Sequence, residues 1–205
     1  MHSSVHWGLG IIIAGITSLY ISVNFWIVGL IILSSIFADF DIFLRKYAQN
    51  GNHRMLFTHS IYLPMILILI GFLSSKIVII VMGFSYLIHI LIDLLDWGTN
   101  ALFTNRIFGI RFLLKRDEHL RVPEIIDQEK IPQWFFVKRY YNSVIMIGIE
   151  VFVSIIMFIT LFLYIPQFWY FLAGYFLTMI FHISEYLELK HLSQGGSPRI
   201  KLLKH

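Results

Sequence analysis

WGLGIIIAGITSLYISVNFWIVGLIILSSIF, at residues 7–37, is the stretch of this sequence that decides its fold class. It is apolar from end to end, with one weak break where residues 20–24 read YISVN. A single membrane-crossing helix needs about 17–25 mostly apolar residues, so the stretch is too long for one ordinary span. The sequence therefore predicts two short helices here, over roughly residues 4–20 and 24–38.

The rest of the apolar sequence repeats this hairpin pattern. A second pair of segments is interrupted by Ser74, Ser75 and Lys76, and a third pair by Pro166, which fits poorly inside a helix. The predicted helices are residues 60–74, 77–95, 143–164 and 167–189. We therefore predict an all-α integral membrane protein with about six short transmembrane helices, arranged as three helical hairpins.

The expected organisation is one membrane-embedded helical domain over residues 1–192, followed by a polar, basic tail over residues 193–205. Within the domain, residues 96–142 form a charged cytoplasmic or interfacial segment. The chain is 58% hydrophobic and has a net charge of +4, which is too modest to indicate a nucleic-acid partner. It has no cysteine, so any bound metal must be held by nitrogen and oxygen atoms.

The basic residues predict the orientation in the membrane. With six spans, both long loops and the tail lie on one side, and that side carries fifteen of the sixteen lysines and arginines. Only Lys76 falls on the other side. The positive-inside rule makes the basic side cytoplasmic, so we expect a multi-pass protein of the cytoplasmic (inner) membrane.

A set of imidazole and carboxylate side chains falls at the helix ends on that same side. An ionisable group beside hydrocarbon is costly unless something binds it. Imidazoles together with carboxylates favour a borderline divalent metal such as zinc or manganese. We therefore predict a site at the cytoplasmic interface for one to three ions, with Zn²⁺ favoured. The candidate ligands are His6, Asp39, Asp41, His53, His59, His89, Asp93, Glu150, His182 and Glu185.

Two spacings carry most of this prediction. His89 and Asp93 are an i, i+4 pair, so they share one helix face and can coordinate one cation together. An Asp that only orients a His has the same spacing, which is the alternative. Asp39 and Asp41 follow a helix end. They could ligate one ion, bridge two ions, or act as ligand and general base, and a solvated helix boundary is the plain alternative.

The remaining candidates have weaker signals. His53 and His59 flank Arg54, whose guanidinium suits a phosphate oxygen. Glu150 lies inside an apolar helix, and His182 with Glu185 forms an i, i+3 pair, but these residues could equally be hydrogen-bond partners between helices. Residues 106–116 alternate basic and apolar residues. That pattern favours an interfacial segment on anionic lipid, with a phosphate-binding role for an arginine as the alternative.

At these residues the sequence resembles the YdjM-type family of LexA-binding, inner-membrane metal-dependent hydrolases. That family carries an N-terminal His, a Pro-Asp-Ile-Asp motif at the end of its second helix, a His-Arg-Gly-x-Thr-His-Ser motif, and a His-x-x-x-Asp motif followed by a Gly. The counterparts here are His6, ADFD at 38–41, HRMLFTHS at 53–60, HILID at 89–93 and Gly98. The match covers roughly residues 1–105. Ala38 replaces the Pro, and one extra residue after Arg54 changes the spacing of the two loop histidines.

The resemblance implies a metal-dependent hydrolase. The order of ligand types is also distantly similar to the zinc-dependent phospholipase C and P1 nuclease class, which is all-helical and acts on phosphodiesters. We therefore expect phosphoester hydrolysis on a membrane lipid or lipid-linked substrate. Arg54 would stabilise charge on the phosphoryl oxygens and Asp41 would take the proton.

The alternative is a non-catalytic scaffold or regulatory protein. There the metal would be structural, and residues 96–142 would dock a regulatory protein partner, as the LexA-binding label of the family suggests. A metal transporter is less favoured, because the candidate ligands gather at one interface and no polar track crosses to the other side.

Overall fold

The computed structural model describes residues 2–48, 52–104, 106–114, 118, 125 and 131–196. Within these ranges it has α1 (Ser3–Ser18), α2 (Phe25–Ile36), α3 (Tyr62–Leu73), α4 (Ile77–Asp93), α6 (Pro132–Asn142), α7 (Val144–Tyr164) and α8 (Leu172–Ser193). The 3₁₀ helices are η1 (Phe37–Tyr47), η3 (His53–Met55), η4 (Phe57–His59) and η5 (Pro166–Phe171). In this part of the chain the only β pairing is a bridge between Thr99 and Phe108, so the all-α class is confirmed.

Local sequence signals explain where several helices begin. The side chain of Asn24 accepts a hydrogen bond from the Ile27 amide and caps α2, and Ser143 caps α7 in the same way through Met146.

Two elements depart from the prediction. Residues 37–47 continue α2 as η1 where we expected a helix end and a polar loop, and α6 lies inside the predicted charged segment. Tail residues 197–205 and residues 115–117, 119–124 and 126–130 lie outside the described residues.

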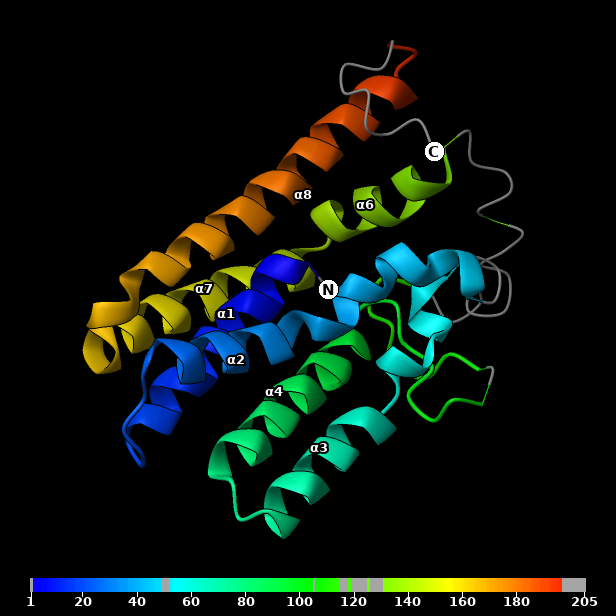
Figure 1. Cartoon of the computed structure of the whole chain (residues 1–205). Helices are drawn as coiled ribbons and strands as arrows, with labels where there is room; N and C mark the ends of the chain where they lie inside the picture. The colour runs from blue at the N-terminus through cyan, green and yellow to red at the C-terminus, as the bar shows by residue number, and fades with distance from the viewer. Residues whose placement is uncertain are drawn as a thin grey trace.

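Helix α1 is the centre of the packing. It lies between α2 and α7 and also contacts α4 and α8, while α2 packs on α4 (Figure 1). The main apolar core is formed by α1, α2, α7 and α8, with Ile11, Ile31 and Met157 fully buried within it. The polar start of α1 is therefore held by helices from both halves of the sequence.

The α3–α4 hairpin packs with unusually close backbones. A Cβ atom on Gly83 would lie 2.9 Å from the Ile68 nitrogen and 3.0 Å from the Pro64 oxygen, and one on Gly71 would lie 2.7 Å from the Ile80 nitrogen. Small residues that let helices approach in this way are typical of membrane helix pairs.

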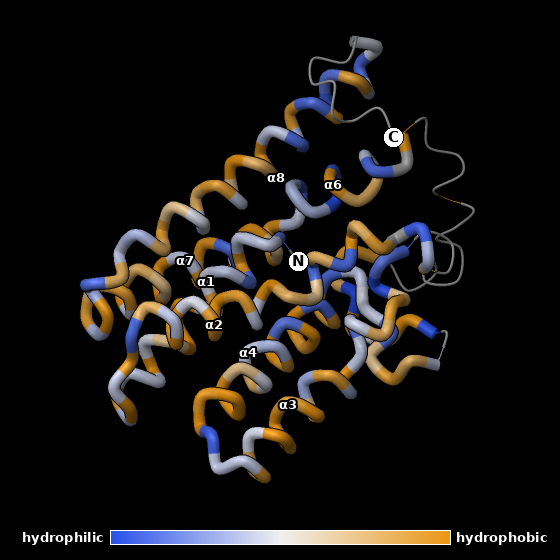
Figure 2. The backbone as a smooth tube through the Cα atoms, viewed as in Figure 1, coloured by the Kyte–Doolittle hydropathy of each residue, from blue (hydrophilic) through white to orange (hydrophobic). Residues whose placement is uncertain are grey.

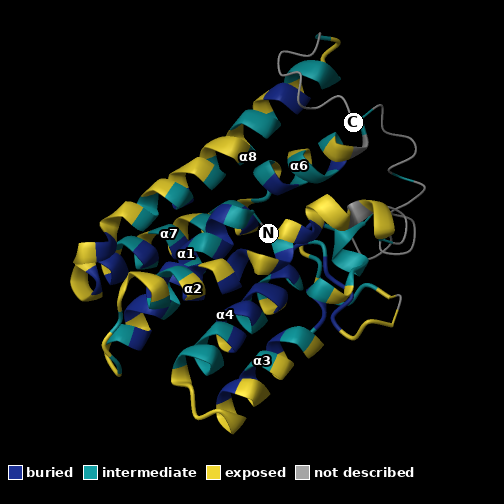
Figure 3. Cartoon of the chain, in the orientation of Figure 1, coloured by how far each residue is buried: buried dark blue, intermediate teal, exposed yellow. Residues whose placement is uncertain are grey.

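Two helical stretches, Phe25–Leu44 and Val144–Tyr164, are long and apolar enough to cross a membrane. Helices α1, α3 and α4 are also apolar but have only 16, 12 and 17 residues. At about 1.5 Å per residue they are shorter than the roughly 30 Å hydrocarbon core. Hydrophobic residues run along most of the helices (Figure 2), and many of them are exposed (Figure 3). The prediction of six spans stays a prediction.

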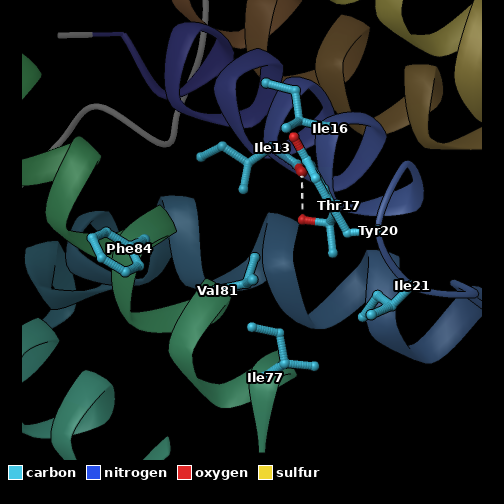
Figure 4. A pocket seen from close by; sticks show the side chains of 8 residues that line it. All are labelled: Ile13, Ile16, Thr17, Tyr20, Ile21, Ile77, Val81 and Phe84. Atoms are coloured by element: carbon cyan, nitrogen blue, oxygen red, sulfur yellow. Dashed lines mark hydrogen bonds between the residues drawn. The ribbon is translucent and has the colours of Figure 1, made fainter. Parts of the chain in front are cut away.

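An apolar cavity of about 290 Å³ lies between α1 and α4. Its lining includes Ile13 and Thr17 of α1 and Val81 of α4, and the Thr17 hydroxyl donates to the Ile13 carbonyl (Figure 4). These positions are on the halves of the two helices remote from His6 and Asp93. The cavity is therefore separate from the predicted metal site.

Candidate metal centre

Four chain segments that are distant in sequence meet beside the start of α1. They are the first turns of α1, η1 after α2, the short helices η3 and η4, and the last turns of α4 (Figure 1). The structure thereby brings together seven of the ten predicted ligands, which are His6, Asp39, Asp41, His53, His59, His89 and Asp93.

Asp93 lies at the centre of this cluster. Its Oδ1 is 3.1 Å from Nε2 of His6, and its Oδ2 is 3.5 Å from Nε2 of both His59 and His89. Two ligands of a tetrahedral Zn²⁺ lie about 3.4 Å apart, given metal–ligand distances of about 2.1 Å. The 3.1 Å contact with His6 is a hydrogen bond, and the two 3.5 Å separations match those of groups that share an ion.

Three groups of three residues in the cluster have ligand atoms within 4.8 Å of one another. We call them the inner triad (His6, His89, Asp93), the middle triad (Asp39, His59, His89) and the outer triad (Asp41, His53, His59). Nδ1 of His89 donates to the Ser35 carbonyl at 2.7 Å, which leaves only Nε2 for a metal. The inner and middle triads thus compete for one nitrogen. The inner and outer triads share no residue and have the ligands for two ions at once.

The helical form of η1 explains how Asp39 and Asp41 serve different triads. With three residues per turn, side chains two positions apart point about 120° away from each other. Oδ1 of Asp39 lies 3.8 Å from Nε2 of His89, whereas Oδ2 of Asp41 lies 2.8 Å from Nδ1 of His59 and accepts a hydrogen bond from the Thr58 hydroxyl.

Several buried polar atoms in the cluster have no hydrogen-bond partner. An unsatisfied buried donor or acceptor costs about 1–3 kcal/mol, so a group of them requires an explanation. They are Nδ1 of His6, Oδ2 of Asp39, Oδ1 of Asp41, Nε2 of His59 and Nε2 of His89. A set of imidazole nitrogens and carboxylate oxygens fits Zn²⁺ or Mn²⁺.

Access to the cluster is one-sided. His6, His59, His89 and Asp93 are at most 1% exposed, whereas the Asp39 side chain is 21% exposed and His53 is half-buried. Asp39 and His53 therefore form the exposed edge of the cluster.

The loop histidines have opposite electrostatic environments. Burial opposes the charged form of His59, but its hydrogen bond to Asp41 and the carboxylate of Asp93 outweigh burial and raise its pKa to about 9. Burial, with the charges of Arg54 and His59, lowers the pKa of His53 to about 4. In the metal-free protein a proton on His59 thus supplies part of the positive charge that the carboxylates attract.

Arg54 is engaged by carboxylates of the protein itself. Nη1 and Nη2 bind the two oxygens of Asp96 at 2.6 and 3.0 Å, and Nη2 lies 3.5 Å from Oδ1 of Asp93. In this arrangement Arg54 holds Asp93 in place, and its charge is already compensated. The sequence interpretation missed Asp96. Its signal was a second acid one turn after Asp93, in the i, i+3 position.

The other three predicted ligands lie apart from the seven and belong to none of the triads among the described residues. Nε2 of His182 accepts a hydrogen bond from the Ser3 amide at 3.2 Å, and its Nδ1 lies 3.7 Å from Glu185. Glu150 accepts hydrogen bonds from the hydroxyls of Ser4 at 2.9 Å and Tyr140 at 3.3 Å.

These contacts hold the first turn of α1, where backbone amides lack helical partners and a carboxylate is favourable. His2 lies 3.4 Å from Glu150 and stacks on His182 with ring centroids 4.4 Å apart. The hydrogen-bonding alternative for Glu150 and His182 thus describes their contacts, and the effect is to position His6 one turn further on.

Comparison of the chain with family models, with curated proteins and with solved structures found no match. The resemblance to the YdjM-type family therefore rests on the motifs alone.

Proposed function

We propose that this protein is a membrane-bound, metal-dependent hydrolase that cleaves a phosphoester in a lipid or lipid-linked substrate. The observation that carries the proposal is the cluster of buried, unpartnered nitrogen and oxygen atoms around Asp93. The donor set fits Zn²⁺, and a bound Zn²⁺ lowers the pKa of a water ligand to about 7 and polarises a phosphoryl oxygen.

The protein side chains have separate roles in this proposal. His6, His89 and Asp93 hold one ion, and His53, His59 and Asp41 can hold another. When the second position is empty, Oδ1 of Asp41, which has no hydrogen-bond partner, can take a proton from water.

The membrane setting explains the class of substrate. The proposal includes the six-span topology with the cluster at the cytoplasmic interface. Two stretches of sufficient length and a surface rich in exposed apolar side chains support it. A lipid in the leaflet could then reach the exposed edge at Asp39 without leaving the membrane.

A structural metal site in a scaffold protein is the second candidate. The full burial of His6, His59, His89 and Asp93 favours it, because structural zinc sites are closed by four protein ligands whereas catalytic sites keep an open position.

The two candidates differ in a measurable way. Co²⁺-loaded protein in lipid nanodiscs would be titrated with inorganic phosphate while its visible absorption spectrum is recorded, and phosphate release from lipid substrates would be measured in parallel. The hydrolase predicts a spectral change and turnover that Asp41→Asn reduces, with the ion at the inner triad retained. An unchanged spectrum with no turnover of lipid, nucleotide or peptide substrates would establish the structural site instead.

A further inference from the structure

The segment 106–114 is anchored to the end of α4, next to the candidate metal centre. The Ile110 amide donates to the Leu94 carbonyl at 2.8 Å, and the Phe112 amide donates to the Leu95 carbonyl at 2.7 Å. The antiparallel bridge between Thr99 and Phe108 closes the other side. Arg111, between the two anchoring amides, is therefore held in a fixed place relative to Asp93 and Asp96.

The backbone of Arg111 has an uncommon conformation. Its φ of +55° lies in the left-handed region, which is unfavourable for a residue with a side chain and is often found at functional sites. The side chain turns back over the loop, and its Nη2 donates to the Ile107 carbonyl.

Gly98 separates Arg111 from Arg54. The Gly98 carbonyl accepts a hydrogen bond from Nη1 of Arg54 at 3.3 Å, and Nε of Arg111 lies 3.0 Å from the place that a Cβ on Gly98 would occupy. The missing side chain at Gly98 therefore lets the second guanidinium approach the candidate centre.

The two arginines differ in their charge partners. Arg54 binds Asp96 and lies beside Asp93, so its charge is compensated. Arg111 has no carboxylate partner among the described residues, and its buried Nε donates to no acceptor. The residue as a whole is half-buried. A fixed, half-buried guanidinium with an unused donor suits a phosphate group, which accepts several charge-assisted hydrogen bonds.

We propose that Arg111 binds the phosphate group of the substrate, in the anion-binding role that the motifs predict for Arg54. This inference rests on the proposed function for its choice of ligand. Arg54 then keeps Asp93 oriented toward the metal, and Arg111 holds the anion beside it. The same chemistry fits a lipid headgroup phosphate and a free phosphate ion.

The test compares Arg111→Gln and Arg111→Lys with the matched control Arg106→Gln, which removes the same charge from an exposed position in the same segment. Zinc content is measured first. Binding of inorganic phosphate to zinc-loaded protein is then measured by calorimetry, and binding to phosphatidylcholine vesicles with and without phosphatidic acid is measured in parallel.

We expect Arg111→Gln to weaken phosphate binding roughly tenfold or more, Arg111→Lys to weaken it less, and Arg106→Gln to change it less than about twofold, all with zinc unchanged. Binding to vesicles that requires phosphatidic acid, together with weak binding of inorganic phosphate, assigns the site to a lipid headgroup. Strong binding of inorganic phosphate assigns it to free phosphate. Equal effects of Arg111→Gln and Arg106→Gln, or no phosphate binding by zinc-loaded wild type, would overturn the inference. Phosphate binding through Arg111 without turnover would retain it and reject the hydrolase.

Discussion

Asp93 and Asp96 share Arg54 at the end of α4, in a site with almost no access to water. Both carboxylates are at most 1% exposed, and the guanidinium lies between them. Removal of one partner from such a group leaves a buried charge uncompensated, which costs about 3–5 kcal/mol in comparable cases.

Asp96→Asn is therefore expected to lower the free energy of unfolding by about 3 kcal/mol and to weaken metal binding, because Arg54 then competes with the metal for Asp93. The double variant Arg54→Gln with Asp96→Asn removes that competitor and should recover part of both losses. Thermal unfolding and zinc affinity of the two variants in detergent provide the measurement. Additive losses in the double variant would show that the two residues act independently.

The pKa of His59 sets a pH dependence for metal binding. Since its pKa is raised to about 9, the imidazole is protonated at neutral pH in the metal-free protein, and a metal must displace that proton. Apparent zinc affinity should rise with pH up to about 9 and then level off.

The same proton affects stability with the opposite sign. A raised pKa in the folded state stabilises the metal-free protein below an unfolded pKa of about 6.5, and this contribution is lost as pH rises through about 9. Zinc titrations in a competing chelator at several pH values, with His59→Asn as the variant that should lose the slope, test the prediction. A flat profile for the wild-type protein between pH 7 and 9 would contradict it.

At the scale of the element, the close contact of α3 and α4 predicts an unusual sensitivity to a single methyl group. Gly83→Ala places a Cβ against the backbone of α3, which cannot move aside as a flexible side chain would, and should destabilise the protein by about 1–3 kcal/mol. Gly148→Ala is the matched control, because a Cβ there meets nothing within 4 Å and Ala favours a helix. Thermal unfolding should separate the two variants, and equal melting temperatures would show that the hairpin is looser than described.

The first turn of α1 provides a second element-scale prediction. Glu150→Ala and His182→Ala each remove a partner of this turn and so displace His6 without touching the other ligands. We expect a shifted Co²⁺ absorption spectrum and a metal affinity lowered by about tenfold, as for other residues that orient a ligand. Glu150→Gln keeps an acceptor for Ser4 and should restore the spectrum. An unshifted spectrum in the alanine variants would separate this polar group from the metal site.

The sequence predicts the elements of this protein better than their lateral arrangement. Apolar runs with breaks at Asn24 and Pro166 predict the hairpins, because burial and helix capping act locally. The predicted helix ends also place His6, Asp39, His59 and Asp93 at the same depth along the helix bundle. A shared depth does not fix how close the side chains lie to one another, however. The sequence predicts the same depth for Glu150 and His182. Helix packing nevertheless places them beside Ser4 and Ser3, apart from the seven clustered ligands.

The site contacts that the sequence did not reveal come from non-local packing. The Ser35 carbonyl limits His89 to one nitrogen, and Asp96 neutralises Arg54, but neither role has a fixed spacing along the chain. The 3₁₀ form of η1 was also missed, although Phe37, Phe40 and Tyr47 recur at a helical spacing that could have indicated a helix.

At the scale of the whole molecule, the uneven distribution of basic residues predicts the orientation of the proposed membrane topology. The chain has no cysteine, so single-cysteine variants give clean labelling. Ser74→Cys, in the exposed turn between α3 and α4, should react with a membrane-impermeant maleimide on intact cells. Gln133→Cys in α6 should react only after permeabilisation. The reverse pattern would invert the topology, and labelling of both sites on intact cells would reject it.

The central claim is that seven side chains from four segments form one metal centre, and metal analysis of the purified protein tests it most directly. Zinc and manganese content would be measured by mass spectrometry for wild type, His89→Ala, Asp93→Asn and the control His191→Ala at the end of α8. We predict one or two ions per chain in wild type and in His191→Ala, and loss of metal in the other two variants while the helical circular dichroism spectrum is retained. Folded wild-type protein that binds no divalent metal at micromolar concentration, or equal metal content in all four proteins, would contradict the claim.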